Sequence, residues 1–158
     1  MNYISKKTLA FGAYLNKKNT IDFNGISMSP LINDGERVIV DIHSSNFSLG
    51  DIIIVMDTNH ELVCHRVISL SPLITKGDRS LVDDKTQSIV GVVTHILKKD
   101  YIITTNKRDL IKRTQTYLSN KNRRGILLRK GYLVVNIILS LIEIKISKTS
   151  LKNHIQSL

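Results

Sequence analysis

The stretch FNGISMSPLINDGERVIV, residues 23–40, joins a turn-forming segment to a strand of β-branched residues. Gly25, Pro30 and the sequence Asn33–Gly35 supply the turn chemistry. The segment ERVIVDI that follows is compact, β-branched and bounded by turn residues, which is typical of a strand. Ser27 stands inside the turn, so we expect its hydroxyl to be presented by a tight loop just ahead of a strand.

Strand-like segments separated by turns continue to about residue 105. They are DIIIVMD at 51–57, ELVCHRVISLS at 61–71, SPLITKGD at 71–78, QSIVGVVTHILKK at 87–99 with Gly91 as a possible bulge, and DYIITT at 100–105. Their hairpin spacing favours an antiparallel sheet over a parallel α/β fold. We therefore predict a mainly β domain over residues 1–105, with a short N-terminal helix at 4–18.

The composition changes beyond this domain. Residues 98–158 contain 14 Lys and Arg against 3 Asp and Glu, whereas residues 1–97 contain 9 against 10. We interpret residues 106–158 as a basic, apolar extension with one or two amphipathic helices, flanked by charges in the manner of an interfacial helix. The flanking charges are Arg123, Arg124, Arg129 and Lys130. Such an extension suits anionic lipid headgroups or nucleic acid, and a solvated basic surface is the plainer alternative.

Three features carry candidate chemistry: Ser27, the strand histidine His65, and the acidic residues Asp78, Asp83 and Asp84 of TKGDRSLVDD. Taken singly, each has a plain explanation as a polar turn, a core histidine or a charged loop. A serine next to a histidine that a carboxylate orients is the constellation of acyl transfer. The single cysteine, Cys64, excludes an internal disulfide and a Cys-rich metal site.

In the order GISMSPLINDGERVIV, GDIIIV, CHRVI, ITKGD and VDD, the chain resembles the S24/S26 serine peptidase superfamily. This superfamily contains the type I signal peptidases and the self-cleaving LexA-type repressors. The resemblance covers roughly residues 21–96. It implies a LexA/signal peptidase-like antiparallel β domain and a serine endopeptidase that needs no cofactor.

The resemblance also implies roles for single residues. Ser27 matches the nucleophile, and His65 stands where bacterial signal peptidases have a lysine, as in the archaeal and endoplasmic-reticulum branch with its Ser–His–Asp triad. Asp84 aligns with the catalytic acid of that branch, and Asp83 is the alternative if the alignment slips by one residue. Asp78 matches the aspartate of the GD turn, which supports the site.

The same loop is expected to supply the oxyanion hole. Gly25 allows a close backbone approach, Met28 is expected to lie buried beneath the loop, and the Ser27 N–H faces the developing oxyanion. Gly25 lacks the hydroxyl that some bacterial relatives carry two residues before the nucleophile. The hole would therefore depend on backbone donors alone.

The function expected from this resemblance is removal of a signal or leader segment from a peptide or preprotein substrate. The basic extension is expected to contact the surface of the cytoplasmic membrane, with the side left open and a soluble cytoplasmic form as an alternative. Two other functions stay open: a LexA/UmuD-like self-cleaving regulator, and an inactive peptide-binding module. Nucleic acid is not an expected partner, because residues 1–20 are too few for a helix-turn-helix.

Overall fold

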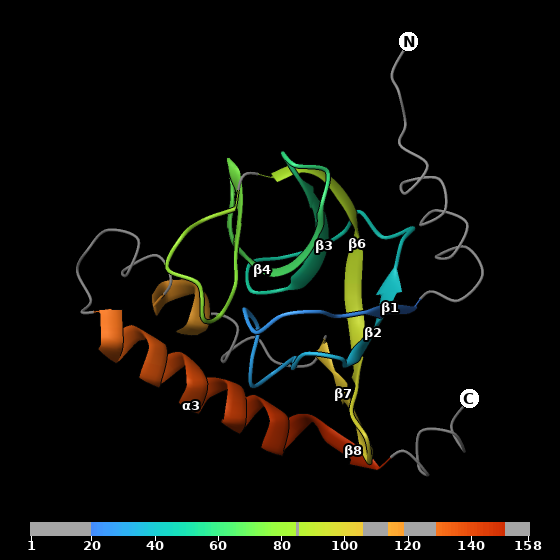
Figure 1. Ribbon diagram of the computed structural model, residues 1–158, viewed down its shortest axis with the longest axis vertical. Helices are drawn as coiled ribbons and strands as arrows, with labels where there is room; N and C mark the ends of the chain where they lie inside the picture. The colour runs from blue at the N-terminus through green and yellow to red at the C-terminus, as the bar shows by residue number, and fades with distance from the viewer. Residues whose placement is uncertain (1–19, 85, 106–113, 119–128, 151–158) are drawn as a thin grey trace.

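The computed structural model describes residues 20–84, 86–105, 114–118 and 129–150 (Figure 1). In the part of the chain that the structure describes, eight strands form one antiparallel sheet, which confirms the predicted mainly β fold. The short helix predicted at residues 4–18 lies outside the described residues. The strands are β1 Thr20–Asp22, β2 Arg37–Asp41, β3 Ile52–Asp57, β4 Leu62–Leu70, β5 Leu73–Lys76, β6 Thr86–Leu97, β7 Tyr101–Thr104 and β8 Lys148–Ser150.

Strand β6 is the axis of the sheet, whose main order is β1-β2-β6-β3-β4-β5. One edge of β6 pairs with β2, while the other pairs first with β3 and then with β7. The sheet curls strongly around β3 and β4 (Figure 1). The register shifts where Gly91 faces Ile54, and a Cβ on Gly91 would lie 2.7 Å from the Asp41 carbonyl oxygen. Gly91 therefore allows β6 to approach β2 closely, next to the point where its pairing with β3 shifts register.

The consecutive isoleucines of β3 reflect burial on both faces of the strand. Ile52 and Ile54 pack into one apolar cluster with Met28, while Ile53 and Val55 pack into another. Successive side chains of a strand point to opposite faces, so a strand covered on both sides needs apolar residues at every position. This double burial fixes the strand that lies next to His65 on β4.

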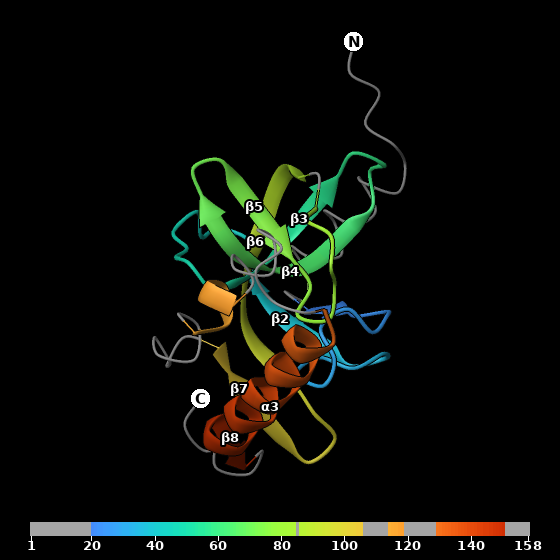
Figure 2. The same cartoon turned by 90° about the vertical axis from the view of Figure 1, so that its left-hand side faces the viewer.

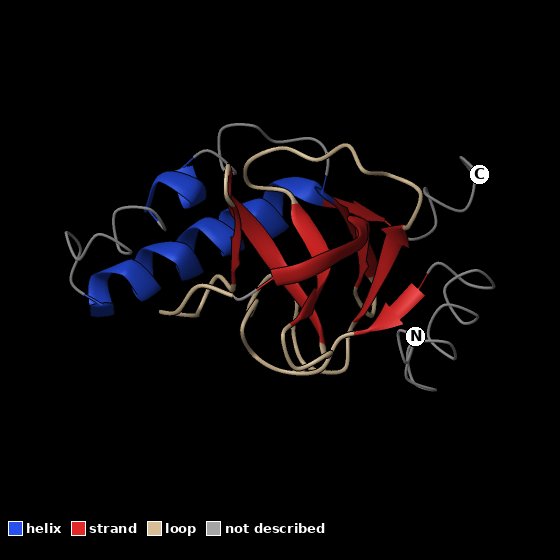
Figure 3. Ribbon diagram, turned by 90° about the horizontal axis from the view of Figure 1, so that it is seen from above, coloured by secondary structure: helices blue, strands red, loops and turns tan. Residues whose placement is uncertain are grey.

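Helix α3, Arg129–Ser147, confirms that the extension contains a helix. It runs alongside the sheet and leads directly into β8, which pairs with β7 (Figures 2 and 3). The sequence did not predict β8, because KTS is too short to show strand alternation. The described part of the extension thus contributes a strand to the sheet, while the predicted domain boundary at residue 105 stays a prediction.

Candidate active site

The loop that carries Ser27 is held by hydrogen bonds on both sides. Gly25 adopts a φ of 116°, and its N–H donates to Asp34 Oδ1 at 2.7 Å. Met28 is fully buried, and its carbonyl accepts from the Ile32 N–H at 3.0 Å. The loop therefore rests on the core through Met28 and presents the preceding residue, Ser27, toward the sheet.

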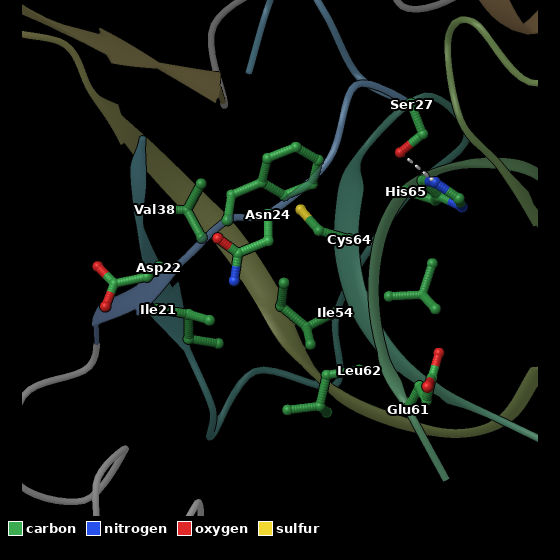
Figure 4. A pocket seen from close by; sticks show the side chains of 12 residues that line it. Ile21, Asp22, Asn24, Ser27, Val38, Ile54, Glu61, Leu62, Cys64 and His65 are labelled. Atoms are coloured by element: carbon green, nitrogen blue, oxygen red, sulfur yellow. Dashed lines mark hydrogen bonds between the residues drawn. The ribbon is translucent and has the colours of Figure 1, made fainter. Parts of the chain in front are cut away.

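His65 lies in the middle of β4, where five consecutive residues are buried. Its ring reaches two partners, with Nε2 at 2.8 Å from Ser27 Oγ and Nδ1 at 2.6 Å from Asp84 Oδ2. Figure 4 shows the Ser27 hydroxyl turned toward this ring. A carboxylate accepts a hydrogen bond from the Nδ1–H, and this tautomer leaves the Nε2 lone pair directed at the serine hydroxyl.

Asp84 is positioned by Thr75 of the neighbouring strand β5. The Asp84 N–H donates to the Thr75 carbonyl at 3.0 Å, and the Thr75 hydroxyl donates to Asp84 Oδ2 at 2.6 Å. The same carboxylate oxygen therefore meets both the Thr75 hydroxyl and the His65 ring. Asp84, and not its neighbour Asp83, is the residue that the structure brings to His65.

Gly77 allows the TKGD turn to lie against the Ser27 loop. A Cβ on Gly77 would be 2.8 Å from His65 Nε2 and 2.9 Å from Ser27 Cβ, closer than real side chains come. The turn is also tied to the loop, because the Arg79 N–H donates to the Ser27 carbonyl at 2.8 Å. Only glycine leaves the serine and histidine in contact at this point.

Asp78 belongs to a buried ionic cluster beside the triad. Arg66 Nε and Nη2 donate to the two Asp78 carboxylate oxygens at 2.8 and 2.9 Å, and Nη2 also lies 3.3 Å from Glu143 Oε2. Arg66 Nη1 donates to the Gly50 carbonyl. Burial by itself lowers the pKa of the Arg66 guanidinium, but Asp78 and Glu143 raise it above its ordinary value. Asp78 therefore supports β4 through Arg66 and does not contact His65.

The backbone N–H groups of Gly25 and Ser27 differ in whether they are free to bind a substrate oxygen. The Gly25 N–H is directed to Asp34, so it is not free to bind a substrate oxygen. Among the described residues, the Ser27 N–H makes no hydrogen bond. Ser27 therefore keeps the donor expected of it, whereas Gly25 acts through its backbone shape.

A cavity of about 600 Å³ opens beside Ser27 and His65. Most of its wall is apolar, and the carboxylates of Asp22 and Glu61 add negative charge (Figure 4). Cys64 also lines it, and burial, followed by the charge of Asp78, raises the pKa of the Cys64 thiol. The remaining lining residues are Ile21, Phe23, Asn24, Val38, Ile54, Leu62 and Val63. Within the described residues, no group of three or more His, Cys, Asp or Glu side chains could hold a metal ion.

Two contributors were not identified from the sequence. Thr75 stands inside the ITKGD box, but nothing in the box distinguishes a threonine that faces the acid from one that faces the core. Glu143 carried a usable signal, since it is the only acidic residue between positions 132 and 147, in a mainly aliphatic run. A lone carboxylate in such a run predicts a buried ion pair.

Comparison with known proteins gives one family match. The family described as Peptidase S24-like matches residues 16–70, a segment that includes Ser27 and His65 and ends before Thr75 and Asp84. No curated protein and no solved structure matches the chain. The family match confirms the predicted resemblance over this segment and is consistent with the S24/S26 peptidase superfamily.

Proposed function

We propose that this protein is a serine endopeptidase of the signal peptidase type, which removes a signal or leader segment by acyl transfer. The observation that carries the proposal is the His65 ring, whose two nitrogens lie 2.8 Å from Ser27 Oγ and 2.6 Å from Asp84 Oδ2. Three side chains from separate parts of the sequence meet in the order that nucleophile, base and orienting acid require.

The proposed reaction follows from these contacts. His65 Nε2 takes the Ser27 proton as Oγ attacks the scissile carbonyl carbon, and Asp84 stabilises the imidazolium that forms. His65 then protonates the leaving amine, so the peptide bond breaks and an acyl ester on Ser27 remains. A water molecule, deprotonated by His65, attacks this ester and releases the acid product and free Ser27.

The oxyanion is assigned to the Ser27 N–H. A backbone donor fixed in a tight loop can bind the negative oxygen without reorganising. The Met28 side chain anchors the loop in the core, which keeps this donor in place. Gly77 has no side chain, so the TKGD turn lies close to the reacting atoms of Ser27 and His65.

The substrate proposed for the cavity is an extended peptide with apolar side chains near the cut. Strand β1 stands at one end of the main strand order, and residues 21–24 line the cavity. A peptide laid along such an edge gains backbone hydrogen bonds, and the cavity receives alternate side chains. Asp22 and Glu61 favour a basic residue in the part of the peptide that faces them.

A second candidate, self-cleavage in the LexA manner, is supported by the match to the Peptidase S24-like family. It uses the same nucleophile on a segment of its own chain. The two candidates differ in kinetic order, because self-cleavage within one molecule does not depend on protein concentration. Cleavage of an added peptide does depend on it.

The test is incubation of the full chain with a pool of synthetic leader peptides, followed by mass spectrometry of the products. We expect cleavage by the wild type and none by Ser27→Ala or His65→Ala. Ser29→Ala is the matched control, since Ser29 lies in the same loop but bonds to Asn33. Turnover that survives Ser27→Ala, or a wild type that cuts no peptide in the pool, would contradict the proposal. Concentration-independent self-cleavage would favour the second candidate.

A further inference from the structure

Helix α3 exposes six aliphatic side chains and buries several polar ones, while Ile144 packs against the core. Tyr132, Asn136, Ser140 and Glu143 are almost fully buried against the domain. The outward side chains are exposed by 37–58%, and they are Val134, Val135, Ile138, Leu141, Ile142 and Ile146. A helix on the surface of a soluble domain usually turns its widest apolar face to the core, whereas the widest aliphatic face of α3 is exposed.

Polar contacts keep the helix in this orientation. Arg66 Nη2 lies 3.3 Å from Glu143 Oε2, and the Lys76 ammonium lies 4.8 Å from the centre of the Tyr132 ring. The Ser140 hydroxyl accepts from the side-chain amide of Gln115 at 3.4 Å. Rolling α3 to bury its aliphatic side chains would break these contacts and leave the Arg66 cluster without Glu143.

The six outward aliphatic residues form one continuous stripe, which we call the outer face of α3. At 100° per residue, they occupy about 140° of the helix circumference. Lys145 lies within that arc and is exposed. An apolar surface that is continuous and exposed marks a site of interaction, unlike single scattered residues.

The charge around the outer face indicates the chemistry of its partner. Between residues 132 and 147, Glu143 is the only acid, and it is turned inward to Arg66. The one cation there, Lys145, points outward. Residues 98–158 contain 14 basic against 3 acidic side chains. This balance is complementary to an anionic surface.

The residue types favour lipid over protein. The outer face consists of Val, Ile and Leu, whereas the centres of protein interfaces are enriched in aromatic residues, Met and Arg. The aromatic residue of α3, Tyr132, is buried against the domain. An interfacial helix gains its affinity from buried apolar area together with attraction to anionic lipids, and neither needs a shaped pocket.

We propose that α3 lies in the plane of an anionic bilayer surface, with its outer face at the boundary between headgroups and acyl chains. Lys145 then extends along the stripe to reach lipid phosphates. Among the described residues, no helix is long and apolar enough to cross a membrane. The proposal concerns docking only and stands apart from the peptidase chemistry.

The test is flotation of the full chain with vesicles of phosphatidylcholine alone or mixed with phosphatidylglycerol. The outer-face variant carries Val134→Gln, Ile138→Gln and Ile142→Gln. Its control carries Leu70→Gln and Ile89→Gln, two aliphatic residues exposed by 49% and 41% elsewhere on the sheet. We expect the wild type and the control to float with the anionic vesicles. The outer-face variant should bind at least about tenfold more weakly.

Equal flotation of the wild type and the outer-face variant would overturn the proposal, as would a wild type that ignores anionic vesicles. So would a wild-type dimer that the outer-face variant dissociates in sedimentation, because a second copy would then cover the helix. Urea unfolding checks that the variant is folded. If it is not, Ile138→Gln and Lys145→Gln are read singly, and flotation equal to that of the wild type in both overturns the proposal.

Discussion

Glu143 on helix α3 reaches Arg66 on strand β4 across 77 positions of sequence. Both side chains are buried, and Arg66 directly follows His65. The C-terminal helix is therefore connected to the strand that carries the proposed base.

The first prediction concerns this connection. Glu143→Leu should lower the free energy of unfolding by about 1–3 kcal/mol, because Arg66 loses one buried acceptor but keeps Asp78. Glu143→Gln should cost less, since an acceptor oxygen remains. The measurement is urea unfolding followed by circular dichroism. Glu61→Gln, at an exposed position, is the control and should change stability little.

Exchange of each neighbouring acid in turn tests the assignment of the orienting carboxylate. Asp84→Asn should lower kcat by about 10⁴-fold, because an amide no longer holds the required tautomer of His65. Asp83→Asn removes the same charge one residue away and should change kcat little. The readout is peptide cleavage at saturating substrate. A larger loss for Asp83→Asn would reverse the assignment.

Thr75 is predicted to be a positioning residue that acts through Asp84. Thr75→Val keeps the shape but removes the hydroxyl that donates to Asp84 Oδ2, and kcat should fall about tenfold. KM should stay unchanged, because Thr75 is not among the residues lining the cavity. Thr75→Ser restores the hydroxyl and should restore kcat. Failure of that rescue would count against the role.

Gly77→Ala places a methyl group against the reacting atoms. We expect kcat/KM to fall by about 100-fold or more, because the Ser27–His65 distance must increase to admit it. Gly131→Ala, where a Cβ meets nothing within 4 Å, is the matched control. Equal activity of the two variants would show that the turn does not lie against the loop.

The chain's one cysteine offers a test of the cavity wall. Burial raises the pKa of the Cys64 thiol, so at pH 8 the reactive thiolate is scarcer than in an ordinary cysteine and forms only as the pH rises toward the raised value. Iodoacetamide should therefore label the folded protein far more slowly than the protein in urea, as measured by intact mass. Similar rates in both conditions would place Cys64 in solvent.

The strands were predictable because their residues are β-branched and their turns carry Gly, Pro or Asn. β2, β3 and β4 each fall within one residue of the segments expected for them. β8 was not predictable, since a three-residue strand is made by its partner β7 and by the helix that delivers it. The sequence indicated an amphipathic helix in the extension, but not which of its residues would face outward and which would pack on the sheet.

For the site, the order of the motifs along the chain and their residue types were enough to predict Ser27, His65 and Asp84 as candidates. Sequence could not choose between Asp83 and Asp84, because a slip of one residue reverses which side chain faces β4. It also could not assign the N–H of Gly25, whose direction depends on a φ of 116° and on Asp34 nine residues later. Which aspartate faces His65 and where the Gly25 N–H points both depend on backbone torsions, which a sequence pattern does not give.

The Glu143 contact also has a consequence for the order in which the protein matures on the ribosome. Ser27, His65 and Asp84 are all translated before residue 85, whereas Glu143, the last carboxylate to reach Arg66, is translated 59 residues after Asp84. A nascent chain can thus contain every group of the hydrolytic centre while Arg66 of β4 still lacks its contact with Glu143. That contact becomes available only once Glu143 has been translated.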